Sequence, residues 1–127
     1  MDLGCRTGRT TWELAKDFDK VTFLQSDPSN MKSVFVGYDL ILVNDILDQM
    51  YNPRHFLSTI HERINPNGRL VIATGFDWSE EYTVRENQVG GYRCSGEQIW
   101  GEEEILIFTN HFLPYYHIYH IFNALIV

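Results

Sequence analysis

The sequence has few basic residues and no cluster of them. Its 127 residues contain ten Lys and Arg against seventeen Asp and Glu, which gives a formal net charge of −7. The basic residues stand singly along the chain. Proteins that bind nucleic acids usually carry a basic stripe, because neutralising phosphates supplies most of their affinity. We therefore expect no nucleic-acid partner.

The marks of an exported or membrane protein are also absent. Cys5 and Cys94 are too few for a disulfide framework, and no Cys-x-x-Cys pair suggests a metal. The chain does not open with a basic segment followed by an apolar one, as a signal peptide would. Its longest apolar run, residues 121–127, is interrupted by Asn123 and falls far short of the ~20 residues that span a bilayer. These absences predict a cytoplasmic protein with no membrane partner.

The histidines do not predict a metal site. Three of them, His111, His117 and His120, lie near the C-terminal end. The His-x-x-His spacing of the last two places them on opposite faces of a strand, which is a poor arrangement for chelation. We expect no metal cofactor.

What the sequence does contain is an alternation of strand-forming and helix-forming segments. Its length suits a single domain over residues 1–127. Near-continuous apolar runs are typical of strands that are covered on both faces. Strands that alternate with helices predict an α/β fold with a mostly parallel sheet. The expected strands are residues 1–3, 21–25, 38–43 and 70–73.

Two helices are expected between these strands. The first is capped by Thr10 or Thr11 and runs through Lys16. The second begins at Asn52 and Pro53, a good N-cap followed by proline at the first helical position. The apolar residues of the two helices are Thr11, Leu14, Ala15 and Phe18 in the first and Phe56, Leu57, Ile60 and Ile64 in the second.

Regular patterning fades after Thr74. Residues 75–97 are polar and aromatic without clear periodicity, and loops of that length in compact domains are usually functional or disordered. Residues 102–110 are compatible with a helix. Residues 112–127 are β-prone, and the sequence does not fix how they pair.

A glycine-bounded loop gives the first indication of chemistry. Residues 2–8 read Asp-Leu-Gly-Cys-Arg-Thr-Gly, between the end of a strand and the start of a helix. Glycine there lets the backbone approach a ligand closely, and the helix start offers free N–H groups. The Gly-x-Gly-x-x-Gly spacing of a dinucleotide site is absent, which disfavours a nucleotide-binding oxidoreductase. A plain bend between strand and helix is the alternative.

The loop resembles motif I of the class I methyltransferases that use S-adenosylmethionine (SAM), with Arg6 in place of the middle glycine. Residues 38–45 resemble motif IV of that family, and residues 64–72 resemble its Leu-x-Pro-Gly-Gly-x-Leu-x-Ile turn and fifth strand. The resemblance implies that SAM is the cofactor and that Asp2 binds its ammonium group, although Asp2 as an ordinary strand-end acid stays open. The residues expected to line SAM through their backbone are Gly4, Cys5 and Gly8.

Ligands in open α/β sheets bind beyond the carboxyl ends of the strands. Asn44 and Asp45 follow a predicted strand and are expected to face the cofactor, with a turn or helix cap as the alternative. Asp27 lies about twenty residues past the glycine loop, where an acid that binds the ribose is expected. Matching to the family instead places Asp27 near the adenine. Both interpretations stay open.

Residues 78–91 match a more specific signature. They begin Trp-Ser-Glu-Glu-Tyr-Thr-Val-Arg-Glu-Asn and end in Gly-Gly. This resembles the Trp-x-Glu-Glu-Phe-Thr-Pro-Arg-Glu-x-Trp-x-Gly-Gly signature of the methyltransferase module of ovothiol synthases, with Val84 in place of proline. Residues 23–30 and 51–57 also resemble that family. The resemblance implies methyl transfer from SAM to an imidazole nitrogen of a thiolated histidine, which is a small-molecule acceptor.

Several side chains in this block suit that reaction. Trp78 and Tyr82 are expected to stack on the imidazole or against the sulfonium, with packing under a loop as the alternative. Of the adjacent Glu80 and Glu81, only one is expected to point inward, and Glu81 is the expected proton acceptor. Arg85 is expected to pair with the substrate carboxylate through a bidentate fork, or merely to order the loop.

Part of the family's fold is missing from the sequence. Such a domain normally runs strand 1, helix A, strand 2, helix B, strand 3 and strand 4, whereas residues 21–25 are the one strand expected between the first helix and Tyr38. Strand 2 and helix B are therefore expected to be absent, which leaves a truncated Rossmann-like domain. An inactive remnant that acts as a binding or scaffold domain stays open, as does a module of a longer enzyme.

Overall fold

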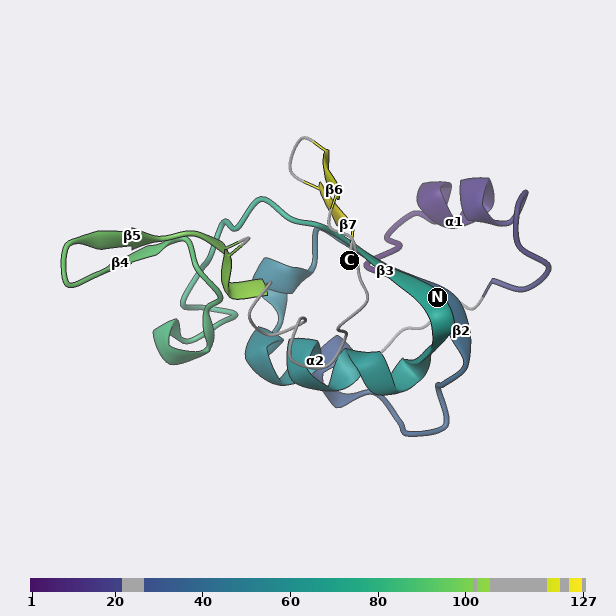
Figure 1. Ribbon diagram of the computed structural model, residues 1–127, viewed down its shortest axis with the longest axis horizontal. Coiled ribbons are helices and arrows are strands. Elements are labelled where there is room, and N and C mark those ends of the chain that lie inside the picture. The colour runs from purple at the N-terminus through teal and green to yellow at the C-terminus, as the bar shows by residue number, and fades with distance from the viewer. Residues whose placement is uncertain (22–26, 102, 106–118, 122–123, 127) are drawn as a thin grey trace.

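The structure is a computed structural model, and it describes residues 1–21, 27–101, 103–105, 119–121 and 124–126. A five-stranded sheet, in the order β1-β2-β3-β7-β6, runs through its centre (Figure 1). β1, β2 and β3 are parallel, β7 is antiparallel to β3, and β6 is antiparallel to β7. The strands are β1 (Asp2–Leu3), β2 (Tyr38–Asn44), β3 (Ile64–Ala73), β6 (Tyr119–Ile121) and β7 (Ala124–Ile126).

The predicted α/β class is confirmed, and so is the shortened sheet. Between α1 (Arg9–Leu14) and β2, the described residues hold one short 3₁₀ helix, η1 (Pro28–Asn30). Within the described part of the chain, β1 lies at the edge of the sheet. The strand predicted over residues 21–25 lies outside the described residues except for Val21, which is not in a strand. The domain is a truncated Rossmann-like α/β fold.

The hydrophobic core lies between one face of the sheet and α2 (Pro53–Thr59), which continues as η3 (Ile60–Arg63). Asn52 Oδ1 accepts a hydrogen bond from His55 N at 3.0 Å, and Pro53 takes the first helical position, so the predicted helix start is confirmed. Alternate residues along β2 and β3 point into this core because side chains alternate between the faces of a strand. The fully buried members from β2, α2, η3 and β3 are Ile41, Val43, Phe56, Leu57, Ile60, Leu70 and Ile72.

β3 starts earlier than the sequence predicts. Its register with β2 jumps from Tyr38 opposite Ile64 to Leu40 opposite Arg69, so the predicted turn at residues 65–68 is a bulge within the strand. Gly68 is needed there because a Cβ atom would lie 2.9 Å from the carbonyl oxygen of Tyr38.

The prediction for the first helix was wrong about its cap and its buried face. The N-cap of α1 is Gly8, in the left-handed conformation (φ 79°), and no side chain caps the helix. Because the helix starts at Arg9, Thr11 lies inside it, where its hydroxyl donates to Asp2 Oδ2. Ala15 and Phe18 lie beyond the end of α1 and are exposed, so of the predicted apolar stripe only Thr11 is fully buried.

The segment after β3 is mostly irregular, with one short helix and one short hairpin. It contains η4 (Arg85–Asn87) and a hairpin of β4 (Tyr92–Cys94) and β5 (Glu97–Ile99), which projects at the end of the molecule opposite α1 (Figure 1). Ser95 and Gly96 both have positive φ, 51° and 88°, as a two-residue hairpin turn requires. The helix predicted over residues 102–110 is seen at residues 103–105, together with residue 101, and the remainder lies outside the described residues.

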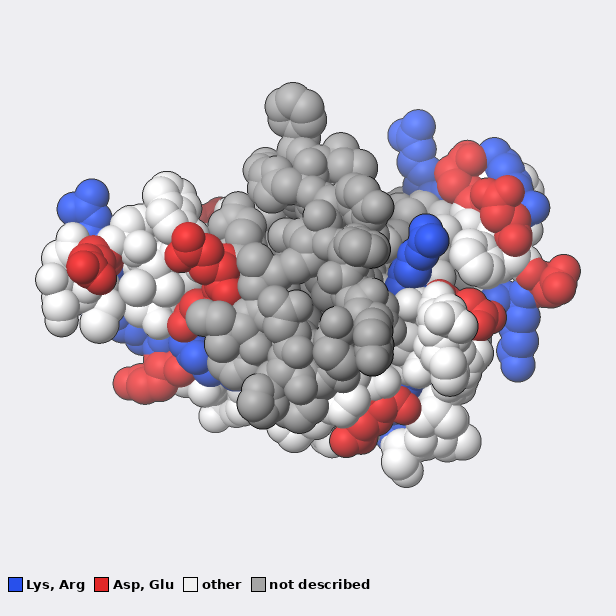
Figure 2. Space-filling view, viewed as in Figure 1, with Lys and Arg blue, Asp and Glu red and all other residues white. Residues whose placement is uncertain are grey.

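The face of the molecule seen in Figure 2 shows no concentration of positive charge among the described residues. In Figure 2 the Lys and Arg side chains stand apart from one another among acidic and uncharged residues. In the described residues, no helix is both long enough and apolar enough to cross a membrane.

Candidate functional site

The glycine loop makes a tight turn directly after β1. Gly4 and Gly8 have φ of 81° and 79°, and Gly8 N donates to the carbonyl oxygen of Cys5 at 2.7 Å. A Cβ atom on Gly4 would lie 2.4 Å from the carbonyl oxygen of Asn44, so a side chain there would collide with the end of β2. Arg6 also has positive φ, 44°, which explains why the related motif has glycine at that position.

Asp2 carries a buried carboxylate of which only one oxygen has a hydrogen-bond partner among the described residues. Its side chain is 0% exposed, and Oδ2 accepts the hydroxyl of Thr11. Oδ1 is buried and has no hydrogen-bond partner among the described residues. Nearly all buried polar atoms in proteins are hydrogen-bonded. An unpaired carboxylate oxygen beside the glycine loop fits the ammonium group of an amino-acid tail such as that of SAM.

Met1 directly precedes Asp2 in the sequence, and its amino group donates to the carbonyl oxygen of Leu40 at 2.7 Å. Burial lowers the pKa of this amino group below its usual value, although the charges of Asp2 and Asp39 act in the opposite direction.

The residues after β2 lie against the glycine loop. Asn44 ends β2 with its carbonyl oxygen facing Gly4, and Asp45 donates its N–H to the carbonyl oxygen of Ala73 at 2.8 Å. Asp45 is exposed and has positive φ, 47°. Ile46 comes next, and a Cβ atom on Gly4 would lie 3.2 Å from its Cβ. The ends of β1 and β2 thus meet beside the glycine loop, and the cofactor contacts expected of Asn44 and Asp45 stay predictions.

Ile46 also lines an open cavity of about 400 Å³. It brings together three residues that the sequence singled out, Asp27, Glu81 and Tyr82. Its volume falls within the range of small-molecule sites. The residues that line it are Asp27, Pro28, Ile46, Gln49, Met50, Tyr51, Glu81 and Tyr82.

Asp27 reaches the cavity as the N-cap of η1. Its Oδ1 accepts a hydrogen bond from Ser29 N at 2.9 Å, which fixes the direction of the carboxylate. The residue is exposed and lines the cavity.

A segment that we call the site loop, residues 77–88, contributes Glu81 and Tyr82 to the lining of the cavity. Its buried Thr83 donates to the carbonyl oxygen of Met50 at 2.5 Å. Asp48, which is also buried, accepts from Asp77 N at 3.0 Å through Oδ2. These contacts join the site loop to the residues around η2 (Leu47–Gln49).

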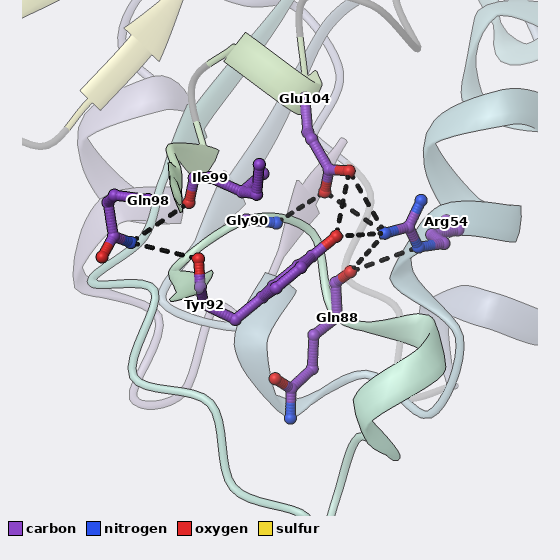
Figure 3. A network of polar contacts seen from close by, with 7 residues as sticks. All are labelled: Arg54, Gln88, Gly90, Tyr92, Gln98, Ile99 and Glu104. Carbon is purple, nitrogen blue, oxygen red and sulfur yellow. Dashed lines mark hydrogen bonds and ion pairs between the residues drawn. The ribbon is translucent and has the colours of Figure 1, made fainter. Parts of the chain in front are cut away.

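The end of the site loop and the residues after it are tied to α2 by a polar network (Figure 3). Arg54 donates to the carbonyl oxygen of Gln88 at 2.8 Å and pairs with Glu104 at 3.3 Å. Glu104 in turn accepts from Gly90 N at 2.6 Å and from the hydroxyl of Tyr92 at 3.3 Å. One arginine therefore holds the site loop, β4 and residue 104 against the same helix.

Comparison with known families assigns the chain. The family model described as "Methyltransferase domain" matches residues 15–110, which is more than half of the sequence. The chain belongs to the methyltransferase-domain family. The match begins after the glycine loop, so the assignment does not depend on that motif. Domains of this family generally use SAM as the methyl donor. No curated protein matches this sequence.

Two predicted substrate residues of this methyltransferase domain lie outside the cavity lining. Trp78 packs against the core, and its ring lies beside Gly91, where a Cβ atom would be 3.1 Å from the indole. Arg85 is exposed at the start of η4. Glu80 is exposed and does not line the cavity, whereas Glu81 does. The roles given to these residues stay predictions.

Sequence reasoning missed the residues that shape the cavity of the methyltransferase domain. Gln49, Met50 and Tyr51 line it, while Thr83 and Arg54 hold the site loop in place. Tyr51 and Arg54 fall within residues 51–57, which the sequence related to a family but did not connect to a site. Nothing in the local pattern indicated that Thr83 reaches Met50, because the two are 33 residues apart.

The predicted histidine pattern is mostly untested. His111 and His117 lie outside the described residues, and His120 is in β6. In the part of the chain that the structure describes, no group of three or more His, Cys, Asp or Glu residues could hold a metal ion.

Proposed function

We propose that this methyltransferase domain binds SAM and transfers its methyl group to an imidazole nitrogen of a small thiolated histidine. One observation carries the proposal: the glycine loop adjoins, through Ile46, a cavity that holds Asp27, Glu81 and Tyr82. The resemblance of residues 78–91 to the methyltransferase module of ovothiol synthases supports the choice of acceptor. Glu81 and Tyr82 belong to that block and line the cavity.

The donor side of the proposed site is the glycine loop. Asp2 Oδ1 would pair with the ammonium group of SAM, while the backbone of Gly4, Cys5 and Gly8 lines the cofactor. Asp27 would accept hydrogen bonds from the nucleoside part, at the ribose or at the adenine. When bound, SAM supplies a methyl group on a positively charged sulfur, which is a good leaving group.

The acceptor side is the wall formed by the site loop. Glu81 would accept the proton that the imidazole ring loses when its nitrogen is methylated. Tyr82 would hold the ring flat against its own, so that the nitrogen points at the methyl group. Holding two reactants in line supplies on the order of 7–11 kcal/mol of the barrier in well-oriented systems, so positioning is the main demand on this chain.

The charge of the cavity supports a positively charged occupant. Asp27 and Glu81 line it, and none of its lining residues is a Lys or an Arg. A sulfonium or a protonated imidazole beside two carboxylates and the rings of Tyr51 and Tyr82 gains attraction from both kinds of group.

Calorimetry with three ligands tests the donor. We expect SAM and its demethylated product to bind and NAD not to bind. Binding of NAD alone would instead indicate an oxidoreductase. A methyl-transfer assay with mercaptohistidine, and with histidine as the control, then tests the acceptor. Turnover of neither would remove the proposed substrate.

Binding without catalysis is the second candidate function. The observation that favours it is the shortened sheet, in which β1 lies at the edge among the described residues. The result that identifies it is SAM binding by calorimetry together with no methyl transfer to either acceptor.

A further inference from the structure

Thr83 joins the two walls of the cavity. We call the segment with Met50 and Tyr51 one wall and the segment with Glu81 and Tyr82 the other, because both pairs line the cavity. We propose that Thr83 is a positioning residue whose hydroxyl sets the separation of these walls and thereby the fit of the methyl acceptor. The inference rests on the proposed function, because it takes the cavity as the place where the acceptor binds.

Every polar group of Thr83 is engaged. Its hydroxyl donates to the carbonyl oxygen of Met50 at 2.5 Å, with the carbonyl oxygen of Asp48 as a longer contact at 3.4 Å. Its N–H donates to the carbonyl oxygen of Ser79 at 2.9 Å, and its own carbonyl oxygen accepts the side-chain amide of Gln88 at 3.2 Å. The side chain is 0% exposed, so water cannot replace these partners.

The cavity side chains have little packing of their own to hold them. Tyr51 is 65% exposed and Tyr82 is 52% exposed. Their positions therefore depend on the backbone from which they project. The bond from Thr83 to Met50 ties the two backbone segments together, one residue away from each tyrosine.

The remaining anchors of the site loop act elsewhere. Asp77 is held by Asp48 at the start of the loop, and Arg54 holds Gln88 at its end. Asn87 reaches the carbonyl oxygen of Tyr51 at 3.2 Å, but this contact is exposed. Thr83 is the buried anchor next to Glu81 and Tyr82, so its loss should loosen the middle of the loop while both ends stay attached.

Three variants of the full chain test the proposal. Thr83→Val keeps the shape of the side chain and removes the hydroxyl, whereas Thr83→Ser keeps the hydroxyl. Thr59→Val is the matched control, because the hydroxyl of Thr59 also donates to a backbone carbonyl oxygen, that of His55 at 3.0 Å, but lies in α2 away from the cavity lining. Thr83→Ala repeats the hydroxyl loss should Thr83→Val fail to fold.

The first measurement needs no activity. Hydrogen exchange in the ligand-free chain should be about tenfold faster at the amides of Tyr82 and Thr83 in Thr83→Val, because a buried carbonyl oxygen loses its donor. Thr83→Ser and Thr59→Val should exchange at these amides like the unchanged chain. Equal exchange in Thr83→Val overturns the proposal, whether or not the protein is a methyltransferase of mercaptohistidine.

The second measurement is the kinetic effect on the two ligands. In Thr83→Val we expect the KM for mercaptohistidine to rise about tenfold while the Kd for SAM stays within about twofold, because the glycine loop is not attached to Thr83. Faster exchange with an unchanged KM overturns the role in acceptor fit. If the unchanged chain methylates no acceptor, the proposed function fails, and the role of Thr83 in acceptor fit fails with it. The hydrogen-exchange comparison still decides whether Thr83 fixes the backbone of the site loop.

Discussion

Single residues decide whether the glycine loop is a binding site or a bend, and Asp2 is the most informative of them. A carboxylate that is 0% exposed loses its hydration on folding, and only one of its oxygens regains a partner, the hydroxyl of Thr11. Burying a charge without full compensation costs free energy. The proposed contact with the ammonium group of SAM would give this oxygen its missing partner.

The substitution Asp2→Asn separates these two contributions. We expect the Kd for SAM to rise about tenfold to a hundredfold, because the charged partner of the ammonium group is lost. The free energy of unfolding should stay the same or rise by about 1 kcal/mol, because a buried charge is removed while Thr11 keeps an acceptor. Calorimetry with SAM and urea denaturation measure the two effects.

The variant Thr11→Val is the control for Asp2→Asn. It should lower stability by about 1–3 kcal/mol, because it leaves the carboxylate without any donor. A marked loss of stability in Asp2→Asn, together with unchanged SAM affinity, would mean that Asp2 serves the fold alone.

Three glycine substitutions test the close approach of the loop to β2. Gly4→Ala introduces a Cβ atom 2.4 Å from the carbonyl oxygen of Asn44 at a positive φ. Gly96→Ala meets a positive φ with open space around it, and Gly75→Ala meets neither problem. We expect stability losses of about 2–4 kcal/mol, about 1–2 kcal/mol and under about 0.5 kcal/mol respectively, measured by denaturation. Equal losses for Gly4 and Gly96 would show that the contact with Asn44 relaxes freely.

At the scale of elements, the site loop keeps its shape through side chains that bind backbone groups. Thr83, Asp48 and Arg54 each contact a main-chain atom rather than another side chain alone. Such contacts fix where a chain passes without requiring a helix or a strand. This explains how a segment with so little regular structure presents Glu81 and Tyr82 at a defined place.

The substitution Arg54→Met tests the anchor at the end of the site loop. It removes the donor to the carbonyl oxygen of Gln88 and the ion-pair partner of Glu104. The side chain of Arg54 is 29% exposed and that of Glu104 is 18% exposed. We expect a loss of about 1–3 kcal/mol in the free energy of unfolding, and faster hydrogen exchange at Gly90 N. Arg54→Lys should recover only part of it, because an ammonium group cannot reproduce the planar fork.

A double-mutant cycle with Glu104→Gln isolates the pair in that network. Coupling of at least about 0.5 kcal/mol between the two sites is expected for residues in one network. Strictly additive losses would mean that the arginine acts through Gln88 and not through Glu104.

The success of sequence reasoning differs between elements for physical reasons. β2 was predictable from its apolar run, and α2 from the Asn52-Pro53 pair at its start. Both signals lie within the element itself, so neither prediction needed knowledge of distant contacts. The predicted start of α1 was wrong because Gly8 takes the left-handed conformation and caps a helix that begins at Arg9, so Thr11 lies inside the helix and cannot cap it. The composition of the cavity could not be predicted, because Thr83 and Met50 meet only after the chain has folded.

The same limit applies to individual roles in the candidate site. Asp27, Glu81 and Tyr82 were proposed for different reasons, and the structure places them in one cavity. Trp78 and Arg85 came from the same sequence block as Glu81 but do not line that cavity. A shared signature shows that residues belong together in the chain, whereas their directions depend on turns such as the one closed by Ser79.

The whole molecule is acidic and small, with a net charge of −7 over 127 residues. A small domain buries a limited share of its surface and has a modest margin of stability. A ligand that binds only the folded state then makes a large relative contribution to stability.

Thermal unfolding with and without ligand gives the prediction at this scale. At a SAM concentration of about 100 times its Kd, the free energy of unfolding should rise by about 2.7 kcal/mol, with a clear increase in Tm. NAD at the same concentration should leave Tm unchanged. No shift with SAM, in a chain that unfolds cooperatively, would contradict donor binding.

The sequence separation between the site loop and the residues that anchor it indicates when the cavity forms during folding. Its contacts join residues 29 to 50 positions apart, from Asp77 with Asp48 to Glu104 with Arg54. Contacts of such separation close late in folding, because the intervening chain must first be ordered. During synthesis, β2 and α2 can pack while the second wall is still emerging from the ribosome. The pocket is therefore completed only after β2 and α2 have formed, and a chain cut before residue 77 lacks two of its lining residues, Glu81 and Tyr82.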